Sequence, residues 1–164
     1  MDRRRPIVSG CGCCLDVDRL INIVSQKGLS SFGGRFNDDF TPINIVVGQE
    51  VIPLPEIMPG RDVEYSDNSI TIEENGIYEI NYSINVSAEV AALVTTSVRV
   101  NGQDIDSTVI SRLIDVDLGT VYSGSTIVEL NSGDVIDMAI SALIAVEVTL
   151  GNGVNASLSI RRIG

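Results

Sequence analysis

The sequence predicts an all-β protein, an antiparallel β-sandwich, and three observations support this fold class. Hydrophobic residues make up 44% of the chain but aromatic residues only 4%, so the core must consist of Val, Ile, Leu and Ala. Val and Ile have stiff side chains that favour strands. From Phe40 onward, apolar residues alternate with polar ones, as in half-buried strands. Turn signals also recur at intervals close to the roughly 8–12 residues expected of a sandwich.

The clearest predicted strand covers residues 77–87, where one face is apolar and the other polar. Its apolar face consists of Tyr78, Ile80, Tyr82, Ile84 and Val86. Asn75-Gly76 before it is a strong turn signal. Such a strand buries one side and exposes the other to solvent.

Similar alternation predicts further strands, and about eight are expected in all. They lie near residues 43–52, 70–72, 94–100, 122–130, 136–140 and 154–160. Pro53 and Pro55 should mark an edge, because proline cannot donate a hydrogen bond to a neighbouring strand. No helix-length pattern separates the strands, which argues against parallel βαβ units.

Two stretches, 90–94 and 139–148, are apolar at successive positions, which an outward-facing strand of a small sandwich should not be. Either these strands are buried between layers, or one face is core and the other contacts another subunit. We favour the subunit contact. The candidate interface residues are Val90, Leu93, Leu143, Ile144 and Val146.

Residues 1–36 are predicted to form a separate N-terminal arm, and residues 37–164 the sandwich domain. The arm carries six basic and three acidic side chains, or +3, whereas residues 37–164 carry five and 19, or -14. Apolar residues at helical spacing predict a short docking helix, with a strand as the alternative. These residues are Val17, Leu20, Ile21 and Val24. Gly33-Gly34 is predicted to be a hinge.

The three cysteines, Cys11, Cys13 and Cys14, all lie in this arm. An odd number cannot pair completely within one chain, so we expect disulfides between chains. A metal or iron–sulfur cluster shared between arms, or free thiols, are the alternatives.

Several kinds of chemistry are excluded or disfavoured. The chain has no histidine, which removes the usual nucleophile–histidine arrangements and histidine-containing zinc sites. The carboxylate pairs Asp104/Asp106 and Asp115/Asp117 are expected to be solvated; calcium there is an alternative. A net charge of -11 disfavours nucleic acid and anionic membranes, and no apolar run is long enough to span a bilayer. We expect no cofactor and no enzymatic activity.

Three segments resemble the tumour-necrosis-factor-like (TNF-like) jelly roll, over about residues 40–164. They are Ile70-Thr71-Ile72-Glu73-Glu74-Asn75-Gly76-Ile77-Tyr78-Glu79-Ile80-Asn81-Tyr82, Val98-Arg99-Val100-Asn101-Gly102 and Val128-Glu129-Leu130-Asn131-Ser132-Gly133-Asp134-Val135-Ile136. This version looks most like the C-terminal domain of bacterial collagen-like spore-surface (exosporium) glycoproteins. The resemblance implies a homotrimer on the extracellular surface of a spore or cell. The collagen stalk of that family is missing here, and the cysteine arm stands in its place.

These observations lead to the hypothesis of a self-assembling structural subunit of a spore or cell-surface fibre or layer. The jelly roll would form trimers, and the arm would link them. The alternative is a surface-displayed head that binds a host or carbohydrate ligand and is anchored by its arm.

Overall fold

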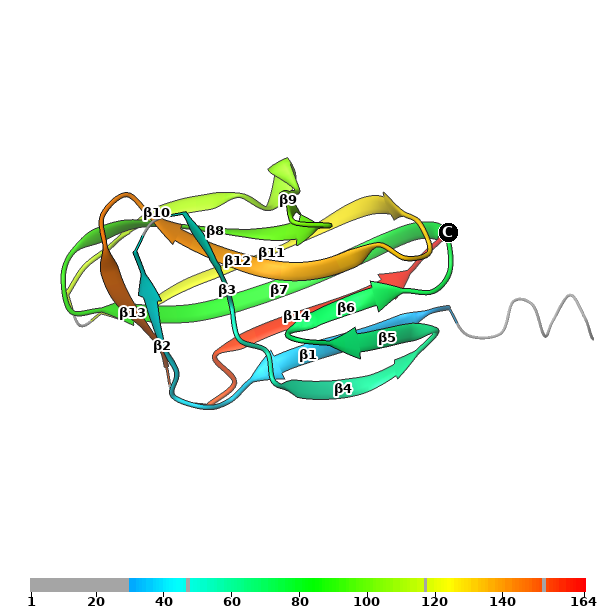
Figure 1. The fold of residues 1–164 in the computed structure, drawn as a ribbon, viewed down its shortest axis with the longest axis horizontal. Helices are drawn as coiled ribbons and strands as arrows, with labels where there is room; N and C mark the ends of the chain where they lie inside the picture. The colour runs from blue at the N-terminus through cyan, green and yellow to red at the C-terminus, as the bar shows by residue number, and fades with distance from the viewer. Residues whose placement is uncertain (1–29, 47, 117, 152) are drawn as a thin grey trace, which may run out of the picture.

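The computed structural model describes residues 30–46, 48–116, 118–151 and 153–164, which form two antiparallel sheets packed face to face (Figure 1). Sheet A contains β1 (Phe32–Asn37), β2 (Pro42–Ile45), β4 (Glu56–Arg61), β7 (Gly76–Ala88), β11 (Thr120–Leu130), β13 (Val146–Leu150) and β14 (Ala156–Arg162). Sheet B contains β3 (Gln49–Val51), β5 (Val63–Ser66), β6 (Ser69–Ile72), β8 (Ala92–Val100), β9 (Gln103–Asp104), β10 (Ile110–Ile114) and β12 (Val135–Ala142). A 3₁₀ turn, η1, covers Asp106–Thr108. The predicted all-β jelly roll is confirmed.

One long strand organises each sheet. In sheet A, β11 pairs with β7 from end to end, while β14 and then β13 follow each other along its opposite edge. In sheet B, β8 pairs with one edge of β12, and β6 and β3 share the other. Because β7 has 13 residues, it spans the molecule along its long axis (Figure 1).

The core lies between the sheets and follows the period-two pattern of the sequence. All five apolar residues predicted for the inner face of β7 are buried. The hydroxyl groups of Tyr82 and Tyr122 donate to the carbonyl oxygens of Thr108 at 3.1 Å and Val94 at 3.3 Å. Burial raises the pKa of both tyrosines, so the hydroxyls stay protonated and remain donors.

The boundary predicted between residues 36 and 37 is wrong, because it cuts through β1. This strand lies inside sheet A, between β14 and β4. The glycines predicted to be a hinge are strand residues. A Cβ on Gly33 would lie 2.7 Å from Tyr65 Oη, and one on Gly34 would lie 2.6 Å from Met58 Sδ, so the close approach of these side chains requires glycine.

The stretch 139–148 is not one strand with an apolar residue on each face. This corrects the expectation that a single strand there has one face in the core and the other against another subunit. The chain leaves β12 at Ala142, bends at Leu143-Ile144, and enters β13 at Val146. Residues 90–94 likewise combine a bend with the start of β8. The unbroken apolar run arises because two buried strands meet at an apolar bend.

Arg35 on β1 is buried, with only 6% of its surface exposed, and it joins the two sheets. Its Nε donates to the carbonyl oxygen of Leu54 at 2.6 Å, and its two terminal nitrogens reach those of Pro55 at 3.1 Å and Ser69 at 3.4 Å. The guanidinium group also lies over the Tyr65 ring, 5.9 Å from its centre. Arg35 therefore supplies hydrogen-bond donors to backbone carbonyl oxygens that the pairing between strands leaves without a donor.

Replacing this arginine by methionine, Arg35→Met, should destabilise the fold by about 3 kcal/mol, because buried carbonyl oxygens lose their donors. Guanidinium unfolding at one fixed protein concentration measures this free energy. Arg161→Met is the control, because its side chain is 64% exposed and should cost less than about 1 kcal/mol. Equal losses for the two variants would show that Arg35 has no special role.

Candidate functional site

The acidic surface limits how copies of this domain can meet. Residues 37–164 carry 19 carboxylates against five arginines. Four of those arginines form ion pairs within the domain, and Arg112 lies over the Tyr122 ring and donates to the carbonyl oxygen of Val121. All five arginines therefore interact with groups of their own domain. Over most of the surface, the remaining negative charges would oppose contact between copies.

One area without charge is the middle of the outward side of the central strands of sheet A, beyond the Arg161–Glu79 ion pair. We call it the serine-rich face; it consists of Asn81, Ser83, Ser123, Ser125, Ser157 and Ser159. Strand register arranges these residues in two rows across β11, β7 and β14, Ser123–Ser83–Ser157 and Ser125–Asn81–Ser159. The rows continue onto Phe36 and Gly34 of β1.

The serine-rich face is suited to contact with another protein surface. Its side chains are short, so the sheet is flat there, and removing a hydroxyl from water costs far less than removing a charge. Two aliphatic residues of β11 accompany it, Val121 (48% exposed) and Ile127 (65% exposed). The sequence predicts that the polar side of residues 77–87 faces solvent, which the structure agrees with, and the alternation alone gives no reason to single out this surface. The signal was the lack of charge at Asn81, Ser83, Asn85 and Ser87.

A second surface lies at one end of the sandwich, and we call it the apolar end. It is defined by Leu93, Leu113 and Leu143, with Val90 and Ile144 beside them. Leu93 and Leu113 are opposite each other on β8 and β10, and the Leu143 amide donates to the Leu93 carbonyl oxygen at 3.4 Å. Leu143 is 81% and Leu113 64% exposed. Four of the five predicted interface residues therefore gather here.

Val146, the fifth predicted interface residue, lies in the core. It is 6% exposed and points between the sheets, so its side chain cannot contact another subunit. The physical reason is that β13 begins at Val146 and directs its first side chain inward.

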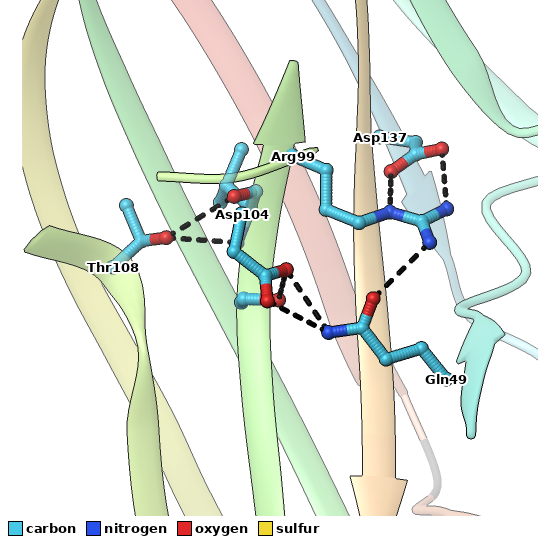
Figure 2. A network of polar contacts seen from close by, with 7 residues as sticks. Gln49, Arg99, Asp104, Thr108 and Asp137 are labelled. Atoms are coloured by element: carbon cyan, nitrogen blue, oxygen red, sulfur yellow. Dashed lines mark hydrogen bonds and ion pairs between the residues drawn. The ribbon is translucent and has the colours of Figure 1, made fainter. Parts of the chain in front are cut away.

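The outward face of sheet B carries a polar network near its middle (Figure 2). Arg99 donates to both carboxylate oxygens of Asp137, at 2.7 and 2.8 Å, and this bond raises the pKa of the guanidinium group. Gln49 joins the pair to Asp104: its Oε1 accepts from Arg99 at 3.4 Å, and its Nε2 donates to Asp104 at 2.8 and 3.0 Å. Ser97 completes the site with a 2.6 Å bond to Asp104.

This network fastens strands together. It connects β3, β8, β9 and β12, and every carboxylate in it is already occupied by donors. Among residues 30–46, 48–116, 118–151 and 153–164, no group of three or more metal-ligating side chains occurs. Over the same residues, no helix is long and apolar enough to cross a membrane.

The three cysteines and the four apolar arm residues, Val17, Leu20, Ile21 and Val24, lie outside the residues that the structure describes. Their predicted roles therefore remain predictions.

Comparison with solved structures places the fold among TNF-like jelly rolls. Murine APRIL at pH 5.0 matches with a TM-score of 0.54 and 17% identity, over 82% of this chain and 99% of that one. Murine APRIL at pH 8.0 matches with a TM-score of 0.57 and 13% identity, over the same shares. Eiger TNF from S. frugiperda matches with a TM-score of 0.55 and 8% identity, over 83% of this chain and 92% of that one.

No curated protein sequence matches the chain. The family model of the BclA C-terminal domain does match it, over residues 34–164. That range contains both sheets, from β1 to β14, and with them the serine-rich face and the apolar end. The BclA C-terminal domain is found in exosporium surface glycoproteins of bacterial spores. This chain belongs to the BclA C-terminal domain family and is a spore-surface protein with a TNF-like jelly roll.

Proposed function

We propose that this chain is a structural subunit that forms trimers through its jelly roll and links trimers into a fibre through its arm. TNF-like and BclA C-terminal domains are typically homotrimeric, which supports the trimer. The observation that carries the proposal is the serine-rich face, a broad uncharged area on a domain with five arginines against 19 carboxylates. The proposed role is assembly and not catalysis.

A ring of three copies needs two different surfaces on each subunit, one that inserts and one that receives. In sheet A, β11 pairs with β7 and presents Val121 and Ile127 outward. The short side chains of Ser157 and Ser159 on β14 leave room to receive them. We therefore place β11 of each subunit against β14 of the next, where Ser157 and Ser159 form one side of the serine-rich face. The expected contact thus moves from the apolar end to sheet A.

The arm supplies the contact between trimers. The structure assigns Arg35 to the sandwich, so residues 1–29 carry five basic and three acidic side chains, a net +2 against the acidic body. Opposite charges favour contact of an arm with another copy. Disulfides through Cys11, Cys13 and Cys14 would then lock neighbouring arms covalently.

A negative charge within the serine-rich face should dissociate the trimer. In Ser125→Glu, an exposed serine beside Asn81 becomes a carboxylate, which the contact would bury without a partner at a cost of several kcal/mol. Sedimentation equilibrium of the chain without residues 1–29, which keeps β1 and the core, should give a trimer for the parent protein and a monomer for the variant.

Ser132→Glu provides the matched control, because Ser132 is equally exposed but lies in the turn between β11 and β12. It should remain trimeric. A monomeric parent protein would contradict the trimer, and a trimeric Ser125→Glu would contradict this interface.

The cysteines and the arm can be tested separately from the trimer. Oxidised full-length protein should give a ladder of covalent species on non-reducing gels, and the ladder should disappear when all three cysteines are serine. Deleting residues 1–29 should abolish fibres in electron micrographs yet leave trimers, because β1 and the core remain intact. Isolated trimers of the oxidised full chain would instead favour a surface-displayed binding head.

A further inference from the structure

We infer that the apolar end is the docking surface for residues 17–24 of the arm of an axially neighbouring trimer. This inference rests on the proposed function, in which the arm links trimers. It assigns the receiving surface to Leu93, Leu113 and Leu143.

The root of the arm and the apolar end lie at opposite ends of the sandwich (Figure 1). β1 begins at Phe32, which is level with Arg161 of β14 and, through it, with Glu79 near the start of β7. The far end of β7, Ala88, bridges to Val116 beside the connection that follows Leu113. In a head-to-tail stack, the arm root of one trimer therefore faces the apolar end of the next.

The length of the chain favours a neighbour over the arm's own domain. From Glu79 to Ala88 is nine residue steps along β7, or about 30 Å. Val24 is eight residue steps from Phe32 and can extend at most about 29 Å from it. The leucines also lie on sheet B, across the core from β1. Val24 therefore falls short of the apolar end of its own chain even when fully extended, so the four residues cannot cover that end together within one chain.

The two surfaces match in chemistry. Val17, Leu20, Ile21 and Val24 would place four aliphatic side chains on one side of a helix. The apolar end offers three aliphatic side chains, one each from β8, β10 and the bend after β12. Leu93 is 37% exposed, Leu113 is 64% exposed and Leu143 is 81% exposed. Exposed apolar surface of this kind is typical of interaction sites.

Charge favours the arm over a second sandwich as the partner. Glu89 and Asp115, both exposed, flank the apolar end next to Val90 and Ile114. Around its apolar set the arm carries Arg19 and Lys27 together with Asp16 and Asp18, so this segment has no net charge to oppose the contact. Two apolar ends in direct contact would instead bring like carboxylates together, which is unfavourable.

A photo-crosslinker in the arm tests the contact directly. Benzoylphenylalanine replaces Leu20 in the full-length protein, isotopically labelled and unlabelled copies are mixed before assembly, and mass spectrometry locates the crosslinks. We expect mixed-isotope crosslinks to peptides that contain Leu93, Leu113 or Leu143. Crosslinks confined to the serine-rich face, to sheet B outside the apolar end, or to other arms would overturn the inference.

The second measurement introduces charge at the receiving surface of the full chain. The double variant Leu113→Glu/Leu143→Glu should keep its trimer, lose its fibres and weaken docking more than about tenfold, because two unpaired carboxylates would be covered by aliphatic side chains. Val154→Glu is the control, because Val154 is 68% exposed in the connection between β13 and β14.

The outcomes separate this inference from the proposed function. If the double variant still forms fibres, the arm docks elsewhere and the inference is wrong, although the fibre remains. If its trimer dissociates, the apolar end is a contact within the trimer, which also overturns the inference. A parent protein that is monomeric contradicts the proposed function itself, and the crosslink positions still decide where the arm binds.

Discussion

The charge of the sandwich is the constraint on which the rest of the molecule depends. Nineteen carboxylates and five arginines in residues 37–164 keep copies apart unless they meet through surfaces without charge. The structure provides two such surfaces, one on the face of sheet A and one at the end of the long axis. They differ in chemistry as well as place: one is flat and hydroxyl-rich, the other is aliphatic. A protein with two separate contact surfaces can form both a closed ring and an open stack.

Strand register places both surfaces. β7 holds β11 on one edge and β14 on the other, and this brings serines that are far apart in sequence into common rows. The apolar end depends on β8 beginning where β10 and β12 end, which brings Leu93, Leu113 and Leu143 together. A shift of one residue in a pairing would exchange inward and outward side chains and destroy the surface that this pairing builds. The Arg99–Asp137 pair joins β8 to β12 within sheet B, and Arg35 on β1 joins sheet A to Ser69 of sheet B.

Much of the fold could be predicted from the sequence, because a strand with one buried face has a clear period of two. Tyr78 to Val86, Ile136 to Ile140 and Ala156 to Ile160 all follow it, and all are core strands in the structure. The short strands were harder. β4 contains Pro59 and lies at a sheet edge, where proline is tolerated. Its residues do not alternate between apolar and polar, so the sequence does not predict it as a strand. β1 was taken for a hinge because Gly33-Gly34 mark a flexible segment equally well.

The candidate site was less predictable, since it depends on neighbours across strands. The sequence marks Leu143 and Ile144 as part of an unusual apolar run, but their exposure comes from a bend between two strands that the sequence does not mark with glycine or proline. The serine-rich face requires the register of three strands, and no single segment contains its pattern. The alternating pattern within one segment therefore predicts a strand. A surface that several strands build together can be identified only when the register of those strands is known.

Electron cryo-microscopy of the assembled full-length protein tests the central claim most directly, that the sandwich meets other copies through its uncharged surfaces. We predict trimers in which β11 of one subunit covers the serine-rich face of the next, and stacked trimers in which density from an arm covers Leu93, Leu113 and Leu143. A map in which the outward side of sheet A is open to solvent, with copies meeting through the outward face of sheet B around Arg99 and Asp137, would contradict the account.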